Sequence, residues 1–301
     1  MRRKLIMQGN ESFTVTLPIK WIKRHGIKEE VDIIEKDGTL EIKPAGAVKE
    51  KPKAKELDIS ALPEFLFIRL IGACYKNSYD EINLKYNTEQ LKAIQAVVDK
   101  LIGYEITEKK PDFLVIKKIV IESVEQYHDS EKKCWHALIS MAEDCLEGIK
   151  KQDKRIFKAV IEADSIIDRF SDYCMYMLLK HKEIEAKNPF VSYLFLHQLE
   201  KIADLFAEIA RLCVEAKFKP SKETFAQHER LKQYISDFYL AYYKFDIEAV
   251  KKIVLERDSM FSSLAKIIEK TKGPEQSYLS CLKEVLNIFS GLITPLLIQN
   301  I

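Results

Sequence analysis

The sequence predicts a mainly α-helical protein with a small β-rich module at its N-terminus and an α/β segment between the two. In residues 1–44, short apolar runs alternate with turn residues, and residues 58–118 mix helix-like and strand-like periods. From about residue 120 onward, apolar residues recur every three or four positions. At 301 residues, the chain is long enough for two or three domains with sizeable cores.

The N-terminal module, residues 1–44, has the turn and cap residues of two strands, a short helix and a hairpin. A basic first strand precedes Gly9-Asn10, and the other strands are predicted at Ser12–Thr16, Val31–Glu35 and Thr39–Ile42. Pro18 favours a helix start, and Gly26 favours its end. Because 44 residues cannot bury an independent core, the module is predicted to be stable only as a dimer.

Basic residues are concentrated at the start of the chain. Residues 1–28 contain seven of them and one acidic residue, Glu11, whereas the whole chain carries 48 basic and 46 acidic residues. Such a local excess suits the phosphate backbone of nucleic acid, although an ordinary solvated basic segment is the alternative. The predicted DNA-binding residues are Arg2, Arg3, Lys4, Lys20, Lys23 and Arg24.

The order of these elements, the Leu17-Pro18-x-x-Trp21 turn and the Asp37-Gly38 hairpin resemble the swapped-hairpin DNA-binding domains of the AbrB/MazE (SpoVT-AbrB) type. This resemblance implies that two chains build one β-barrel, and that its basic side chains lie on DNA. It therefore implies a homodimer formed through residues 1–44.

The middle of the chain predicts a linker followed by a small α/β connector. Residues 45–57 are small and charged and contain Pro52, which is typical of a linker. Within residues 58–118 we expect helices at Pro63–Lys76 and at Thr88–Ile102, with Thr88 as N-cap, and strands at Glu81–Tyr86, Tyr104–Thr107 and Phe113–Ile116. No residue pattern indicates what this connector does.

The remainder predicts an antiparallel bundle of six helices, near residues 120–150, 153–183, 190–217, 221–244, 247–271 and 275–299. The six helices look like three repeated twice. Glu162, Asp164 and Ser165 align with Glu256, Asp258 and Ser259 at one constant offset. We therefore predict repeat 1 at residues 119–218 and repeat 2 at residues 219–301.

Cysteine usage and hydropathy favour a cytoplasmic protein. The six cysteines form no C-x-x-C pair, and most fall at apolar helix positions, so they are predicted to be small core residues. No secretory signal and no run of 18 apolar residues is recognised, so no membrane insertion is expected.

Six carboxylates form a predicted acidic strip in repeat 1. They are spaced i, i+4 and i+8 on two successive helices: Asp164, Asp168 and Asp172 on one, and Glu200, Asp204 and Glu208 on the next. Like charges at this spacing cost roughly 0.2–0.5 kcal/mol per pair in an isolated helix. A divalent cation would relieve that repulsion, since such ions prefer oxygen ligands. By spacing alone, a solvated acidic face is the favoured interpretation.

The patterns Asp164-x-x-Ile167-Asp168 and Leu199-Glu200-x-Ile202-x-Asp204 resemble motifs of PhoU, the phosphate-uptake regulator family, which is also built from three-helix repeats. An AbrB-like front end on a PhoU-like body resembles archaeal PhoU-type regulators. This resemblance implies iron, zinc or other divalent metal ions at the acidic strip. The metal residues it implies are Asp164, Asp168, Glu200, Asp204 and Glu208, where Glu208 replaces the family's Asn.

Repeat 2 departs from that pattern. Ser262, Lys283 and Asn287 stand where repeat 1 has Asp168, Glu200 and Asp204. We therefore expect one competent metal site and one degenerate one.

These features favour a dimeric, DNA-binding transcriptional regulator of phosphate uptake whose helical body senses metal or binds a protein of the phosphate system. The alternative is a signalling adaptor that acts on a phosphate transporter or signalling kinase and uses the N-terminal module mainly to dimerise. A carboxylate di-iron enzyme would need two Glu-x-x-His pairs facing inward. The chain offers only Glu125-x-x-His128 and a reversed His197-x-x-Glu200, so we expect no enzyme activity.

Overall fold

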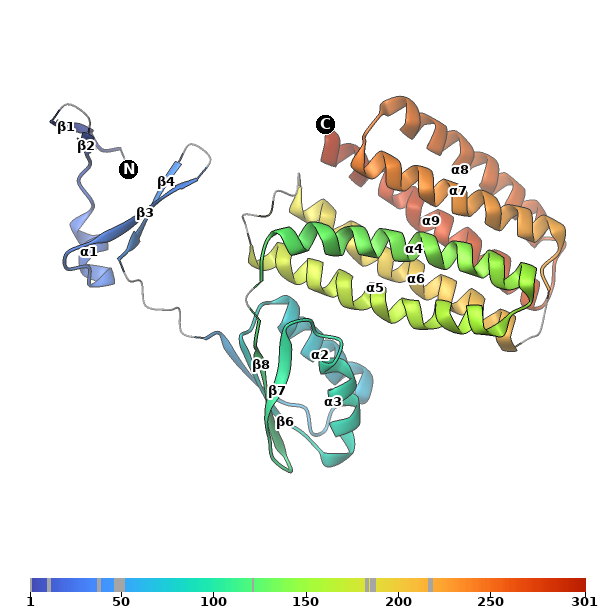
Figure 1. The fold of residues 1–301 in the computed structure, drawn as a ribbon, viewed down its shortest axis with the longest axis horizontal. Helices are drawn as coiled ribbons and strands as arrows, with labels where there is room; N and C mark the ends of the chain where they lie inside the picture. Colours follow the sequence, from blue (N-terminus) through green and yellow to red (C-terminus); the bar gives the residue numbers. More distant parts are fainter. Residues whose placement is uncertain are drawn as a thin grey trace. The chain divides into compact units, whose positions relative to one another are not determined.

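The computed structural model describes residues 2–9, 12–36, 39–45, 52–120, 122–181, 184, 188–215 and 219–301. The chain divides into two compact units, residues 1–53 and 54–301. The second unit contains an α/β domain and a long helical bundle (Figure 1). The predicted mainly α fold class is confirmed.

The N-terminal unit has the predicted element order: β1 (Ile6–Gln8), β2 (Ser12–Thr14), α1 (Ile19–His25), β3 (Val31–Lys36) and β4 (Thr39–Pro44). β1 pairs with β2 and β3 pairs with β4, both antiparallel. Pro18 precedes the first turn of α1, and Gly26 ends the helix at φ +61°. Glycine suits that position because residues with a Cβ rarely adopt the left-handed conformation. The predicted Asp37-Gly38 turn lies outside the described residues.

The α/β domain is a four-stranded sheet with helices on one face (Figure 1). Its elements are β5 (Ala54–Asp58), α2 (Glu64–Lys76), β6 (Glu81–Lys85), the 3₁₀ turn η1 (Thr88–Gln90), α3 (Leu91–Val98), β7 (Tyr104–Lys109) and β8 (Phe113–Lys118). The strand order is β5-β6-β8-β7, with β5 parallel to β6 and the other pairs antiparallel. Phe67, Ile71 and Ile94 are buried between the helices and the sheet.

Three expectations for this region need correction. The linker predicted at residues 45–57 is shorter, because Ala54–Asp58 form β5. Parallel pairing with the distant β6 supplies the hydrogen bonds of this charged strand, which its composition does not reveal. The N-cap is Asn87 instead of Thr88, because the Asn87 side chain accepts a hydrogen bond from the Glu89 backbone N–H. The α-helix that follows ends at Val98, before the predicted Ile102.

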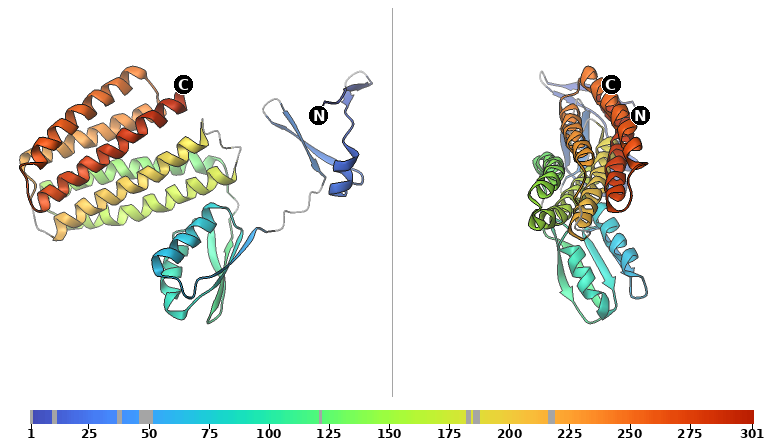
Figure 2. Two further views of the ribbon diagram at one scale, coloured as in Figure 1. Left: turned by 180° about the vertical axis from the view of Figure 1, so that it is seen from behind. Right: turned by 90° about the vertical axis from the view of Figure 1, so that its right-hand side faces the viewer.

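The bundle contains the six predicted helices: α4 (Glu125–Lys151), α5 (Lys154–Lys180), α6 (Pro189–Glu215), α7 (Lys222–Tyr243), α8 (Ile247–Ile268) and α9 (Pro274–Asn300). α4, α5 and α6 pack together, and so do α7, α8 and α9 (Figure 2). The two groups meet where α6 contacts α9 and α4 contacts α7. Each group consists of three consecutive helices, and the division into two repeats stays a prediction.

The bundle core uses the apolar stripes expected from the sequence. Val160, Ile167 and Cys174 of α5 are fully buried, as are Leu199 and Ile202 of α6. All six cysteines are buried, as predicted. Among the helices that the structure describes, α9 is long and apolar enough to span a membrane, with a mean hydropathy of 1.5 over its most apolar window. Half of that window is buried, and α9 packs against α6, α7 and α8, so its apolar character is that of a core helix.

Candidate functional site

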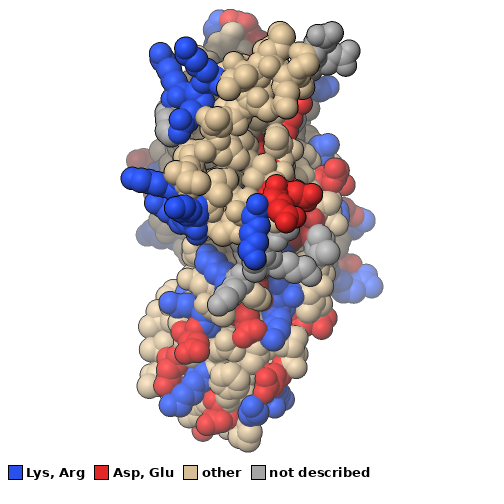
Figure 3. Space-filling view, turned by 90° about the vertical axis from the view of Figure 1, so that its left-hand side faces the viewer, with Lys and Arg blue, Asp and Glu red and all other residues tan. Residues whose placement is uncertain are grey.

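The predicted DNA-binding side chains are all exposed. Arg2, Arg3 and Lys4 lie in the segment before β1, and Lys20, Lys23 and Arg24 lie on α1. Figure 3 shows Lys and Arg side chains gathered beside a broad uncharged surface in the upper half of the view. The second half of the unit has the opposite charge, since Glu29, Glu30, Asp32, Glu35 and Glu41 lie just before or within the β3–β4 hairpin. The predicted basic residues therefore lie in the segment before β1 and on α1.

The same unit exposes most of its apolar side chains. No residue that the structure describes between 2 and 45 is buried. Among those described residues, nine large apolar side chains are exposed: Leu5, Ile6, Met7, Phe13, Val15, Ile19, Ile33, Ile34 and Leu40. A surface this apolar is expected to be covered by another chain. The described residues of this unit therefore form no buried core within one copy, and the dimer stays a prediction.

The acidic strip lies along the seam between α5 and α6. These neighbours place Asp168 and Asp172 of α5 opposite Glu200 and Asp204 of α6, and all four line one groove. Ser171 crosses the seam by donating a hydrogen bond of 2.6 Å from Oγ to Oε1 of Glu200. The i, i+4 spacing in the sequence therefore identified carboxylates that lie close together in the tertiary structure.

Two lysines of the α/β domain lie on this strip. Nζ of Lys76, at the end of α2, is 2.5 Å from Oδ1 of Asp172. Nζ of Lys100, just after α3, is 3.4 Å from Oδ2 of Asp168. The groove between α2, α3, α5 and α6 has a volume of about 650 Å³. Sequence reasoning missed both lysines, because no local spacing relates them to carboxylates so far along the chain.

The two lysines do not fully balance the negative charge of the strip, because burial and neighbouring carboxylates raise the pKa values of its acids. Burial, together with the negative charges of Asp168 and Asp204, raises the pKa of Asp164 to about 6. Burial and the nearby Asp172 raise the pKa of Glu200 to about 8. Burial raises the pKa of Asp168 even though Lys100 opposes it. In addition, Oδ1 of Asp164 is buried without a hydrogen-bond partner among the described residues.

The strip has the oxygen donors that a hard divalent cation prefers, but not their arrangement. Within the described residues, no three His, Cys, Asp or Glu side chains converge so that they could hold one ion. Glu208 lies apart from the groove, in a second hollow of about 490 Å³ that is also lined by Ser280 and Cys281 of α9. As arranged here, the residues do not fit a metal centre, and the metal site stays a prediction.

In repeat 2, the two acids that align with acids of repeat 1, Glu256 and Asp258, are paired with arginines. Nε of Arg230 lies 2.9 Å from Oε1 of Glu256, and a terminal nitrogen of Arg257 lies 2.7 Å from Oδ1 of Asp258. A guanidinium stays charged at all ordinary pH values, so it is a permanent counter-ion. These pairs give both acids a counter-ion, and the degeneracy of the second site stays a prediction.

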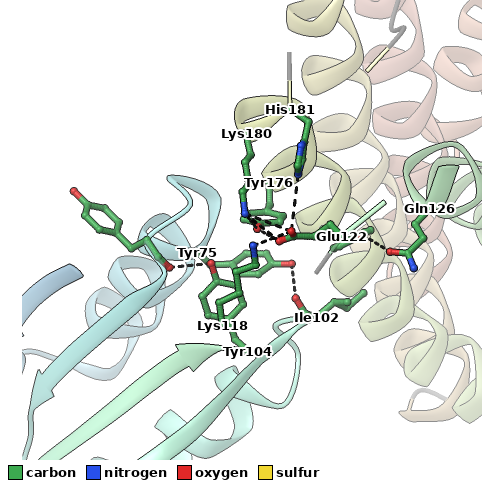
Figure 4. Close-up of polar contacts among 11 residues, drawn as sticks. Tyr75, Ile102, Tyr104, Lys118, Glu122, Gln126, Tyr176, Lys180 and His181 are labelled. Carbon is green, nitrogen blue, oxygen red and sulfur yellow. Dashed lines mark hydrogen bonds and ion pairs between the residues drawn. The ribbon is translucent and has the colours of Figure 1, made fainter. Parts of the chain in front are cut away.

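A buried junction fixes the α/β domain beside the strip (Figure 4). Tyr75 of α2 stacks on Tyr176 of α5, with ring centroids 4.9 Å apart, and Tyr104 packs edge-on against Tyr75. Next to them, Glu122 lies 2.8 Å from Nζ of Lys118 and 3.3 Å from Nζ of Lys180. This contact holds the C-terminal end of α2, and hence Lys76, against α5.

Comparison with known families agrees with this geometry. Residues 6–50 match the family model described as antidote-toxin recognition MazE, bacterial antitoxin, and residues 136–213 match the PhoU domain model. The chain joins a MazE-like domain to a PhoU domain. The PhoU match covers all six residues of the acidic strip.

One solved structure supports the fold of the PhoU body. The crystal structure of the phosphate transport system regulatory protein PhoU from Streptococcus pneumoniae aligns with a TM-score of 0.50 and 11% sequence identity. The alignment covers 58% of this chain and 94% of that one. At this identity the likeness concerns the fold alone. No curated protein matches the chain.

Proposed function

We propose that this protein is a dimeric, DNA-binding transcriptional regulator of phosphate uptake. The observation that carries the proposal is the union, in one chain, of an exposed basic MazE-like unit with a PhoU domain. The PhoU domain supports a role in phosphate homeostasis. The basic residues of the segment before β1 and of α1 are compatible with binding to the DNA backbone.

Dimerisation would complete the N-terminal unit and double its charge. Two copies can cover each other's exposed apolar side chains, and they would combine two sets of the six basic residues on one assembly. In this proposal the acidic β3–β4 hairpin faces away from DNA, because its charge would repel phosphate.

The PhoU domain would provide the input, in a cytoplasmic protein. The matched relative is named as a phosphate transport system regulatory protein, which supports contact with a phosphate transporter. A signalling kinase is the other proposed partner. A divalent or iron-type metal ion held by Asp164, Asp168, Glu200, Asp204 and Glu208 would be a second input, and its binding would require these side chains to leave the arrangement described above, in which Glu208 lies in a separate hollow. We propose no catalytic step for the domain.

Fluorescence-anisotropy titration of promoter DNA tests the DNA-binding role. DNA from the protein's own promoter and from nearby phosphate-gene promoters is titrated across a salt series with the full chain. A dimer that makes six or more phosphate contacts should give a log–log salt slope of roughly −5 or steeper. The triple variant Lys20→Gln, Lys23→Gln, Arg24→Gln should bind weakly with a shallower slope.

Lys43→Gln is the matched control, since Lys43 is an exposed base of the same unit that faces Glu41 at 3.6 Å. It should leave DNA affinity nearly unchanged. Weak, promoter-independent binding by the unmodified protein would contradict the regulator and favour the adaptor, in which the MazE-like unit only dimerises.

Metal content of the purified protein tests the second input separately. Asp204→Ala should lower bound metal per chain to near zero. Asp258→Asn, at the position of repeat 2 that aligns with Asp164, should leave it unchanged, because Asp258 already pairs with Arg257. Metal content that is unchanged in Asp204→Ala would remove the assignment.

A further inference from the structure

The groove between α2, α3, α5 and α6 has two unlike walls. The bundle helices contribute charged or ionisable side chains, whereas the α/β domain adds a row of small or apolar ones. The apolar row includes Phe65, Ile68 and Gly72 of α2 and Ala93 and Ala96 of α3. A Cβ at Gly72 would meet nothing within 4 Å, so the wall is open there. A volume of about 650 Å³ at a domain junction, with a few charged groups opposite an apolar wall, is typical of a small-molecule site.

Part of this groove carries positive charge without a counter-ion. Arg69 of α2 and Lys201 of α6 line the groove, and neither forms an ion pair with a residue that the structure describes. His197 of α6 lines the same groove. Burial and the positive charges of Lys201, Lys76 and Arg69 lower its pKa, although one carboxylate opposes them. The three bases therefore converge on the part of the groove next to His197.

Most carboxylates of the strip are engaged elsewhere. The two lysines of the α/β domain occupy two of them. Glu200 is held toward α5 by the hydrogen bond from Ser171. Asp204 raises the pKa values of Asp164 and Asp168, so it lies toward the other end of the strip. The two unpaired bases are therefore available to an anion from outside the chain.

An aromatic ring is exposed beside one of these bases. Phe65 of α2 is 73% exposed. The guanidinium carbon of Arg69 lies 5.4 Å from the centre of that ring, in a cation–π contact. An exposed flat ring can stack on a planar aromatic ligand such as a nucleobase. The groove therefore combines a stacking surface with two cations.

We infer that this groove binds a nucleoside monophosphate, with its phosphate on Arg69 and Lys201 and its base against Phe65. A phosphate monoester carries a charge of about −1.5 to −2 at pH 7, which two unpaired cations balance. A guanidinium can bind two phosphate oxygens at once, and an ammonium adds a point charge. The inference goes beyond the proposed function, because it requires neither DNA nor metal. It gives the α/β domain a role as one wall of the site.

Isothermal titration calorimetry of the full-length protein with AMP, GMP, CMP and UMP tests this site. At least one of the four nucleotides should bind at a single site per chain. Inorganic phosphate and the matching nucleoside should each bind at least about tenfold more weakly, because each makes only part of the contacts.

Substitutions within the groove locate the bound nucleotide. Arg69→Gln with Lys201→Gln should weaken nucleotide binding at least about tenfold, because the charge-assisted bonds to phosphate are lost. Phe65→Ala should weaken nucleotide binding and leave the weaker binding of inorganic phosphate unchanged. Lys92→Gln, at an exposed lysine of α3 that does not line the groove, is the matched control and should bind as the unmodified protein does.

Gly72→Leu fills the groove without removing a charge. Leucine is a better helix former than glycine, and the space at Gly72 is open, so this variant should stay folded and lose nucleotide binding. Thermal unfolding checks the fold of each variant.

Unchanged binding in Gly72→Leu or in the double variant would place the nucleotide elsewhere, for instance on the basic residues of the N-terminal unit, and would overturn the inference. Absence of binding of all four nucleotides to the unmodified protein would overturn it too. Neither result bears on DNA binding, which anisotropy measures separately.

Discussion

Tyr242 of α7 donates a hydrogen bond of 2.8 Å to Oε1 of Glu131, a buried carboxylate of α4, and so ties the second three-helix group to the first. Tyr127 donates to the same oxygen at 2.9 Å, and Tyr243 donates to Oε2 at 3.1 Å. Hydrogen bonds from three phenols thus replace the water that a carboxylate loses on burial.

Tyr242→Phe should lower the free energy of unfolding by about 1–3 kcal/mol, because it leaves a buried carboxylate with one donor fewer. Urea denaturation measures this change. Tyr239→Phe is the control, since its hydroxyl contacts the more exposed His136 and should matter less. Similar stability losses in the two variants would show that the Glu131 network has no special role.

Glu122 predicts a dependence of stability on acid pH. Burial opposes its ionisation, but hydrogen bonds from Lys118 and Tyr176 outweigh burial and lower its pKa to about 2. A carboxyl with a lowered folded-state pKa stabilises fully above its ordinary value near 4.5, and this stability is lost as pH falls toward 2. The unmodified protein should therefore lose up to about 3 kcal/mol more than Glu122→Gln over that interval.

Unfolding free energies of both proteins, measured at several pH values between 5 and 2, check this prediction. Other carboxyls titrate in both proteins, so only the difference between the two curves reports Glu122. Parallel curves would mean that the ion pairs with Lys118 and Lys180 do not stabilise the ionised form.

Gly148 marks a close helix contact where a side chain does not fit. A Cβ at this position would lie 2.9 Å from the buried ring of Phe157, at the turn from α4 to α5. Gly148→Ala should destabilise by about 1–3 kcal/mol through overpacking. Gly291→Ala is the control, because a Cβ there meets nothing within 4 Å, and alanine is the better helix former. Thermal unfolding of both variants shows whether the Phe157 ring can shift to make room for the added methyl group.

The exposed apolar surface of the N-terminal unit predicts that acidic substitutions within it will dissociate the proposed dimer. Phe13 and Leu40 are 59% and 67% exposed, and Phe13→Asp with Leu40→Asp should shift the protein to monomers because a buried carboxylate is costly. Sedimentation velocity measures the shift. Leu240→Asp, which changes an exposed leucine of α7, should leave the assembly as it is. A dimer that persists in the double variant would place the subunit contact elsewhere.

The local pattern of apolar and turn residues was sufficient to predict most elements of the fold. Helical periods between Glu125 and Asn300 depend only on which residues are apolar, and breaks such as Gly273-Pro274 act within a few residues. For the same reason α1 could be bounded by Pro18 and Gly26. The strand Ala54–Asp58 escaped prediction because its partner β6 is distant in sequence and its own residues are charged.

The sequence by itself determined that acids recur on one face of α5 and of α6, because helical spacing is a local property. Only the tertiary structure decided what lies opposite them. It brought Lys76 and Lys100 onto Asp172 and Asp168, and it moved Glu208 to a separate hollow beside α9. The physical reason is that domain packing depends on buried contacts such as that of Tyr75 with Tyr176. The positions of nearby charged side chains such as Lys76 follow from that packing.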